Sequence, residues 1–234
     1  MPQMTIYTIL FIIVSLLMPA MAILNSKTIT DVLVNKPELK KGIYFQGILI
    51  QWMLCLFIIS SMWFYGDEFH IIGLNFIHTT HWVTLFVVAP IISYLYFSYA
   101  KPSAITRRII LKIYNHVSHY LPKTTEQYRW GVALSFTAGF CEELIYRGFI
   151  FWQLKLFLNF WPAVLLTNII FALTHYGTGW KNAMGAFVFG MIFSGLYLYT
   201  GNLWLSITCH IIIDLIAMTL YPKVFIQEKK QSMQ

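Results

Sequence analysis

The stretch CEELIYRGF, residues 141–149, places two carboxylates and a guanidinium inside an otherwise apolar segment. Further ionisable side chains follow in later apolar segments, and the whole set is Glu142, Glu143, Arg147, His175, His210 and Asp214. A charged side chain at the centre of a bilayer costs at least about 2.5–3.5 kcal/mol on insertion scales, and such residues normally face a bundle interior or a wet cavity. We therefore interpret this set as a functional cluster.

The spacing of Glu142, Glu143 and Arg147 predicts which of the two carboxylates pairs with the arginine. Glu143 and Arg147 are four residues apart, so they lie on one helix face and can form an ion pair. Glu142 is rotated by about 100° from Glu143 on a helix and cannot share the arginine equally well. The ion pair is compatible with a purely structural role, whereas Glu142 is left for a different partner.

Histidines on other predicted helices are candidate partners. Asp214 follows His210 by one turn, so we expect it to hydrogen-bond one nitrogen of His210 and to fix the tautomer. Counted from the inside face of the membrane, Glu142 and His210 both lie about 11 residues deep, or roughly 16 Å, and can meet in one layer. His175 comes out shallower by the same count, unless its helix runs on towards Trp180 or is tilted.

A carboxylate and two histidines that converge in a dry cavity are typical of sites that activate water. The carboxylate takes a proton from the water with the help of one histidine, and the other histidine stabilises the oxyanion formed at an attacked carbonyl. A zinc site is the alternative, because Glu142, His175 and His210 could supply three ligands and leave a fourth position open. No HExxH motif occurs in the sequence, and we expect neither a metal nor another cofactor.

The composition is that of a polytopic membrane protein. Of the 234 residues, 58% are hydrophobic and 11% are charged, and the mean hydropathy is +0.66. A soluble domain carries about a quarter charged residues. A spanning helix needs about 20 mostly apolar residues, and the segments that qualify are 5–24, 44–64, 82–100, 131–152, 157–176, 183–200 and 203–220. We predict an all-α transmembrane bundle of about seven spans.

Lysine and arginine gather in particular connections between these segments. They are frequent in 25–43, in 101–130 and after 221, whereas 65–81 and 201–202 contain none. The positive-inside rule therefore predicts an external N-terminus and a cytoplasmic C-terminus. The formal net charge of +7 resides in these connections, so we expect no nucleic-acid partner.

Two segments allow more than one interpretation. The basic stretch 101–130 has apolar positions at helical spacing, which predicts an amphipathic interfacial helix; a solvated linker is the alternative. The segment 5–24 ends near MPAMA, which resembles a signal-peptide cleavage site, but it lacks a basic n-region. We therefore expect it to be a retained first helix.

At the charged residues the chain resembles the CAAX prenyl endopeptidase-like membrane proteins, also called the CPBP or ABI family. EELIYR at 142–147 matches the EExxxR motif of that family, FALTH at 171–175 matches FxxxH, and HIIID at 210–214 matches HxxxN/D. The three motifs occur in the right order on separate predicted helices. The resemblance covers about residues 128–220, which we separate as a catalytic core from N-terminal spans at 1–127 and a basic tail at 221–234.

The resemblance implies an intramembrane endopeptidase of the glutamic type, which needs no metal. Glu142 and His175 would then activate water, and His210 with the position of Asp214 would stabilise the oxyanion. The same motifs make Glu143, Arg147 and Phe171 supporting residues. The family often has Asn at position 214; because an ionised Asp is a poor oxyanion donor, we assign Asp214 to orienting His210.

Family members with the best-known activity cleave after a prenylated cysteine near a protein C-terminus. For this chain we accordingly expect a membrane-embedded or lipidated protein substrate, in the cytoplasmic membrane of a prokaryote. Two other function classes stay open. One is a non-catalytic scaffold or bacteriocin-immunity-type protein, in which the polar cluster binds a partner. The other is a proton-coupled transporter with a carboxylate–histidine relay, although the sequence shows no inverted repeat.

Overall fold

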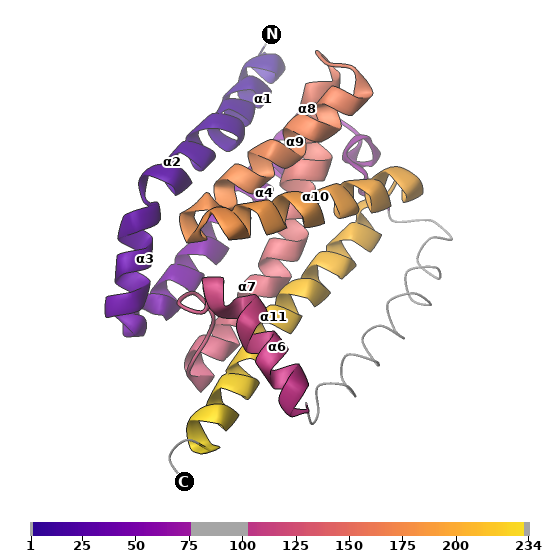
Figure 1. The fold of residues 1–234 in the computed structure, drawn as a ribbon. Helices are drawn as coiled ribbons and strands as arrows, with labels where there is room; N and C mark the ends of the chain where they lie inside the picture. Colours follow the sequence, from indigo (N-terminus) through magenta and orange to yellow (C-terminus); the bar gives the residue numbers. More distant parts are fainter. Residues whose placement is uncertain (1, 76–102, 232–234) are drawn as a thin grey trace.

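A computed structural model describes residues 2–75 and 103–231, and within these ranges the chain is helical without any β-strand (Figure 1). The elements before the gap are α1 Pro2–Ile12, η1 Ile13–Leu17, α2 Met18–Leu24, α3 Ser26–Asn35, η2 Pro37–Leu39, α4 Lys40–Tyr65 and η3 Phe69–Ile72. Those after it are α6 Ala104–Tyr114, η4 Asn115–Val117, α7 Thr125–Glu142, η5 Glu143–Ile150, α8 Phe151–Lys155, α9 Phe160–Thr174, η6 His175–Thr178, α10 Trp180–Thr200 and α11 Leu203–Gln231. The predicted all-α class is confirmed for the described residues.

Some of the predicted spans reappear as long apolar helices. In the described part of the chain, the stretches long and apolar enough to cross a membrane are Met4–Leu24, Pro37–Tyr65 and Trp180–Thr200, and a shorter apolar helix covers Leu203–Thr219. The predicted span 82–100 lies outside the described residues. Membrane character is therefore supported, while the number of seven spans stays a prediction.

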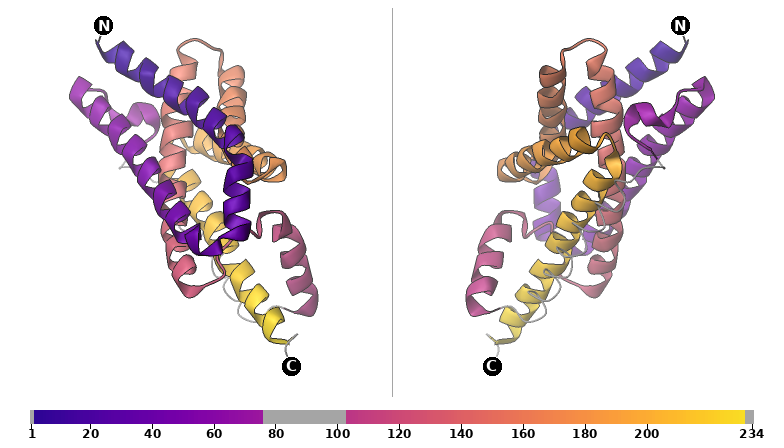
Figure 2. Two further views of the ribbon diagram at one scale, coloured as in Figure 1. Left: turned by 90° about the vertical axis from the view of Figure 1, so that its left-hand side faces the viewer. Right: turned by 90° about the vertical axis from the view of Figure 1, so that its right-hand side faces the viewer.

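The predicted spans at 131–152 and 157–176 differ from free-standing membrane helices. The first becomes part of a continuous helical rod formed by α7, η5 and α8, and this rod carries the charged motif. The second becomes α9, which has only 15 residues. Both are packed by neighbours, since α7 contacts α4 and α11, and α9 contacts α10 and α2. Figure 1 and Figure 2 show α7 running along α11, while α10 crosses the two at a steep angle.

The close approach of α7 to α11 depends on a glycine. A Cβ atom on Gly139 would lie 2.3 Å from Cγ1 and 2.8 Å from the backbone nitrogen of Ile211. Any larger residue would push the two helices apart, because these distances are shorter than Cβ contacts allow. Glu142 at the end of α7 and Glu143 at the start of η5 follow one turn later, so this contact sets their level against His210 on α11.

The basic stretch 101–130 contains a short capped helix. The Ser103 hydroxyl accepts a hydrogen bond from the backbone N–H of Thr106 at 3.1 Å and caps α6. Ile110 on α6 is buried, whereas Ile105 and Ile109 are exposed. A helix is therefore present at Ala104–Tyr114, and the plain-linker interpretation is wrong for these residues. Its placement at a membrane interface stays a prediction.

The loop before α7 is tied to the beginning of α4. Nζ of Lys40, a fully buried residue, donates to the carbonyl of Leu121 at 2.7 Å. The hydroxyl of Tyr44 donates to the carbonyl of Tyr120. These bonds fix α4 against the start of the α7 rod, which matters because α4 also contributes to the site below.

The C-terminal helix is longer than predicted. The sequence suggested a span ending at residue 220 and a separate tail, but α11 runs from Leu203 to Gln231 with Pro222 inside it. Proline removes one backbone donor and usually kinks or ends a helix, so the boundary at 221 was a reasonable prediction from the sequence.

Candidate active site

The central rod changes its geometry where the carboxylates begin. The α-helix α7 ends at Glu142, and residues Glu143–Ile150 form the π-helical segment η5. All residues of η5 are buried, including Glu143 and Arg147. Single π-helical turns inside α-helices occur frequently at functional sites, and here the wider turn coincides with the EELIYR motif.

Glu143 begins a chain of buried hydrogen bonds. Its Oε1 accepts from Nη1 of Arg147 at 3.0 Å, which is the ion pair expected from the spacing. Nη2 of Arg147 donates to Oδ1 of Asn168 on α9 at 3.2 Å. Asn168 in turn donates through Nδ2 to the Ser194 hydroxyl on α10 at 2.9 Å. A buried ion pair is tolerated better when further hydrogen bonds satisfy its atoms. This chain of bonds does so for Nη1 and Nη2 of Arg147, whereas Nε of Arg147 and Oε2 of Glu143 are buried without a partner among the described residues.

Aromatic rings enclose the charged groups. Cζ of Arg147 lies 4.2 Å from the ring centroid of Phe171, a cation–π contact. The ring of Phe193 stacks on the imidazole of His210, with centroids 4.9 Å apart and an interplanar angle of 21°. The Phe of the FALTH motif therefore supports the arginine, and the α10 aromatic fixes the plane of the histidine.

His210 is oriented by Glu143. Nδ1 of His210 lies 2.8 Å from Oε1 of Glu143, and a carboxylate only accepts, so Nδ1 carries the proton. The predicted hydrogen bond in which Asp214 accepts from His210 is absent: Nε2 of His210 lies 3.9 Å from Oδ2 of Asp214, too far for a hydrogen bond. Our assignment of the orienting role to Asp214 is thus corrected. Glu143 of η5 binds the ring of His210 in place of Asp214, which lies one turn away on the same helix.

His175 reaches the same level as His210 although the residue count placed it shallower. α9 ends at Thr174, and His175 begins the 3-10 turn η6. Nδ1 of His175 lies 3.0 Å from the carbonyl oxygen of Phe171, which only accepts, so this nitrogen also carries a proton. Nε2 of His175 then faces Glu142, 3.9 Å from its Oε2.

Three of the predicted residues therefore converge on one point. Oε2 of Glu142 is 3.9 Å from Nε2 of His175 and 3.8 Å from Nε2 of His210, and it is buried without a hydrogen-bond partner. Exposure rises towards the outside: the side chain of His210 is 7% exposed, that of Glu142 13%, that of His175 27% and that of Asp214 32%. The group is accessible from the side of His175 and Asp214.

The sequence analysis missed two uncharged polar residues of this site. Nε2 of Gln51 on α4 donates to Oε1 of Glu142 at 2.8 Å. Asn168, on α9, joins the arginine to Ser194 as described above. An amide inside a predicted span is itself an unusual feature, and this signal was available in the sequence for both. All candidate residues predicted from the sequence lie in the catalytic core 128–220, whereas Gln51 lies in the predicted span 44–64.

Gly190 on α10 makes room for the hydrogen bond between Arg147 and Asn168. A Cβ atom on Gly190 would lie 2.5 Å from Oδ1 of Asn168 and 2.8 Å from Nη2 of Arg147. Both distances are too short, so an alanine there would break the hydrogen bond between the two side chains.

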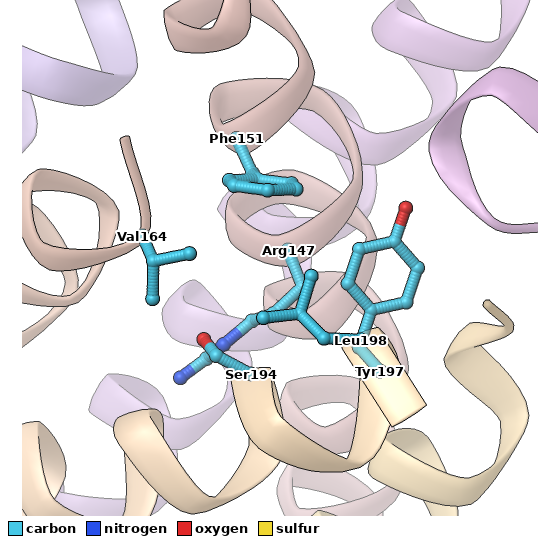
Figure 3. Close-up of a pocket in the computed structure, with 6 residues that line it drawn as sticks. All are labelled: Arg147, Phe151, Val164, Ser194, Tyr197 and Leu198. Carbon is cyan, nitrogen blue, oxygen red and sulfur yellow. The ribbon is translucent and has the colours of Figure 1, made fainter. Parts of the chain in front are cut away.

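A separate small pocket lies beside the Arg147 side chain. It is a shallow space lined by Arg147, Phe151, Val164, Ser194, Tyr197 and Leu198 (Figure 3). None of the converging carboxylate and imidazole groups lines it. We therefore place the candidate active site at Glu142 and its two histidines rather than at this pocket.

The donor groups were also considered as a metal site. Among the described residues, no group of three or more His, Cys, Asp or Glu side chains is arranged to hold a metal ion. In particular, the separations of 3.8–3.9 Å between Oε2 of Glu142 and the two imidazole nitrogens exceed those between ligands around zinc, about 3.3 Å for bonds of 2.0–2.1 Å. Metal independence stays a prediction that a chelator tests.

Comparison with known protein families agrees with the motifs. Residues 124–216 match the family model described as Type II CAAX prenyl endopeptidase Rce1-like. The matched segment starts at Thr124, which caps α7, and ends just after Asp214, so it contains all three motifs and every candidate catalytic residue. No curated protein and no solved structure matches the chain. The resemblance drawn from EELIYR, FALTH and HIIID is confirmed over this segment: residues 124–216 are similar to the Rce1-like type II CAAX prenyl endopeptidases.

Proposed function

We propose that the protein is an intramembrane endopeptidase that hydrolyses a membrane-embedded or lipidated protein with water activated by Glu142. The observation that carries this proposal is the unpartnered Oε2 of Glu142, which lies within 4 Å of Nε2 of both His175 and His210. The family match supports a protease and thereby a hydrolase. The glutamic mechanism and the nature of the substrate are our proposals.

The protonation pattern assigns a role to His175. Its Nδ1–H is used by the carbonyl of Phe171, so its Nε2 offers a lone pair. A water placed between His175 and Glu142 donates one hydrogen to each of them. Its oxygen lone pair is then directed outward, towards a substrate carbonyl, which is the arrangement that a general base requires.

His210 serves as the oxyanion donor in its doubly protonated form. Nδ1–H is bound to Glu143, so a second proton on Nε2 makes an imidazolium that faces the site. The carboxylates of Glu143 and Asp214 flank this ring, and both favour the positive charge. Asp214 thus helps to charge His210 rather than to orient it, which explains how an Asp occupies the position often taken by Asn.

The hydrolysis step follows from these roles. The water oxygen attacks the carbonyl carbon of the scissile bond, one water proton passes to Oε2 of Glu142, and Nε2–H of His210 stabilises the oxyanion. When the carbon–nitrogen bond breaks, the proton on Glu142 passes to the leaving amine. The second water hydrogen leaves with the new carboxyl group, so Glu142 returns to its initial state. No step requires a metal or another cofactor.

The location of the protein is proposed on related grounds. The described ends of the chain lie at opposite ends of the bundle (Figure 1), which supports termini on opposite sides of the membrane. The basic connections place the C-terminus in the cytoplasm. The bilayer is thus the immediate partner of the protein, and we propose the cytoplasmic membrane of a prokaryotic cell.

The test uses purified protein in detergent, wild type and Glu142→Gln, against membrane-anchored peptides with and without a farnesylated C-terminal cysteine. We expect cleavage by the wild type alone, unchanged by a chelator. Cleavage by both proteins would contradict the mechanism. Loss of cleavage with chelator would show a metal enzyme. Absence of cleavage by either protein, together with equal rescue of a deletion phenotype by both genes, would show the scaffold function instead.

A further inference from the structure

We propose that Gln51 of α4 belongs to the catalytic apparatus: its amide N–H₂ holds Glu142 so that Oε2 alone acts as the base, and its carbonyl oxygen receives a backbone N–H of the substrate. This inference rests on the proposed function. Gln51 lies outside the segment matched by the family model, which begins at residue 124, so nothing in that match assigns it a role.

The first part of the inference comes from the contact between the two side chains. Nε2 of Gln51 lies 2.8 Å from Oε1 of Glu142. An ionised carboxylate only accepts hydrogen bonds, so the nitrogen of the amide must face it, and the orientation of the amide is thereby settled. The two carboxylate oxygens are no longer equivalent. Oε1 is held by the amide, and Oε2 is free to face the two histidines.

The second part comes from the other end of the amide. The Oε1 atom of Gln51 is buried and has no hydrogen-bond partner among the described residues. Buried amide oxygens normally accept a hydrogen bond. We therefore infer that a bound substrate supplies the donor for this oxygen. A peptide substrate that reaches Glu142 brings backbone N–H groups, and these are donors of the required kind. Gln51 therefore has the chemistry to bind the substrate next to the scissile carbonyl.

The position of Gln51 is stabilised by its neighbours on α4. Nε1 of Trp52 donates to the Thr137 hydroxyl on α7 at 3.1 Å, and the Trp52 ring stacks on Phe140 with centroids 5.6 Å apart. The same helix is fixed at its beginning by Lys40, as described above. α4 is thus docked on α7 at the level of the carboxylate, so the amide is presented by a rigid element.

Gln51→Met tests the inference because methionine keeps the length of the side chain and removes both hydrogen-bonding ends. Trp52→Phe is the matched control, since it removes one α4–α7 hydrogen bond from the adjacent residue without approaching the carboxylates. We expect Gln51→Met to lower kcat/KM by about 10–100-fold, as the loss of orientation at a reacting group does. We expect Trp52→Phe to stay within about threefold of the wild type, as for the loss of one neutral hydrogen bond.

Two readouts separate this role from a merely structural one. Loss of the donor to Glu142 lets the carboxylate turn out of its productive orientation, so kcat falls in Gln51→Met. Loss of the acceptor weakens substrate binding, so KM rises as well. Trp52→Phe moves neither. A Gln51→Met protein with wild-type kcat and KM, beside an inactive Glu142→Gln protein, would overturn the inference and leave the proposed function standing.

A stability measurement decides the contact even if no peptide is cleaved and the proposed function fails. Thermal unfolding is compared for the wild type, Gln51→Met, Glu142→Ala and the double variant in the same detergent. If the two side chains are bonded, Gln51→Met lowers Tm in the wild-type background by more than in the Glu142→Ala background. Equal Tm shifts in both backgrounds would overturn the proposed link between Gln51 and Glu142.

Discussion

Glu143 joins Arg147 to His210: its Oε1 atom lies 3.0 Å from Nη1 of the arginine and 2.8 Å from Nδ1 of the histidine. The two adjacent glutamates therefore make different contacts. One carboxylate sets the tautomer and charge of an imidazole on α11, and the neighbouring Glu142 is left with a free oxygen that faces the site.

Replacement of Glu143 by Gln should damage both stability and activity. The change leaves the buried guanidinium of Arg147 without its counter-charge, and breaking a buried ion pair costs about 3–5 kcal/mol. It also places an amide opposite Nδ1 of His210, which no longer favours the imidazolium. We expect a clear loss of Tm in detergent and a loss of cleavage. A Glu143→Gln protein with wild-type Tm would show that the pair does not support the bundle.

The approach of α7 to α11 gives a prediction based on volume alone. Gly139→Ala places a methyl group 2.3 Å from Cγ1 of Ile211, so α11 has to move away and His210 with it. We expect cleavage to fall at least tenfold and Tm to decrease, since overpacking costs about 1–3 kcal/mol.

Gly185→Ala on α10 is the matched control for this change. A Cβ atom there meets nothing within 4 Å, so the same substitution should leave activity intact and leave Tm unchanged or raise it, because alanine favours a helix over glycine by about 1 kcal/mol. Equal losses at Gly139 and Gly185 would mean that helix composition, rather than the α7–α11 contact, determines activity.

The sequence predicted contacts within a helix better than contacts between helices. The Glu143–Arg147 pair was predictable because a spacing of four brings side chains together on any helix. The same rule failed for His210 and Asp214, since the carboxylate of Glu143 on η5 comes closer to the ring than that of Asp214 on its own helix. Which of two carboxylates binds an imidazole depends on helix packing, and that packing depends on Gly139, whose role no periodicity reveals.

Some features of the fold also follow from the sequence, whereas others do not. Long apolar helices at Met4–Leu24, Pro37–Tyr65 and Trp180–Thr200 follow directly from hydropathy. The depth of His175 did not follow from counting residues, because α9 is short and the histidine sits on a 3-10 turn. Gln51 was overlooked since it is uncharged and no motif contains it.

Asp214→Asn separates the two roles considered for this carboxylate. If Asp214 promotes the charged form of His210, its removal makes Nε2 lose its proton at lower pH. The alkaline limb of the kcat/KM profile then moves to lower pH, while activity near the acid limb is retained. If Asp214 set the tautomer, as the sequence alone suggested, activity would fall at every pH with no movement of the limb.

Chelation provides a prediction about the mechanism as a whole. In the proposed mechanism, Glu142 activates the water and His175 orients it, so incubation with excess chelator followed by dialysis should leave the rate of cleavage unchanged. Added zinc should not increase it. Activity that disappears with chelator and returns with zinc would replace the proposed mechanism by metal-assisted hydrolysis.

The most direct test of the account is the comparison of kcat/KM for Glu142→Gln, His175→Ala and the double variant. Groups that act as a unit on one water show strongly non-additive losses. Loss of a general base costs about 10²–10⁴-fold, so Glu142→Gln should fall in this range, and adding His175→Ala should lower the rate by no more than a few-fold further. Losses that multiply in the double variant, or a Glu142→Gln protein with the wild-type rate, would contradict the proposal that these two side chains activate the same water.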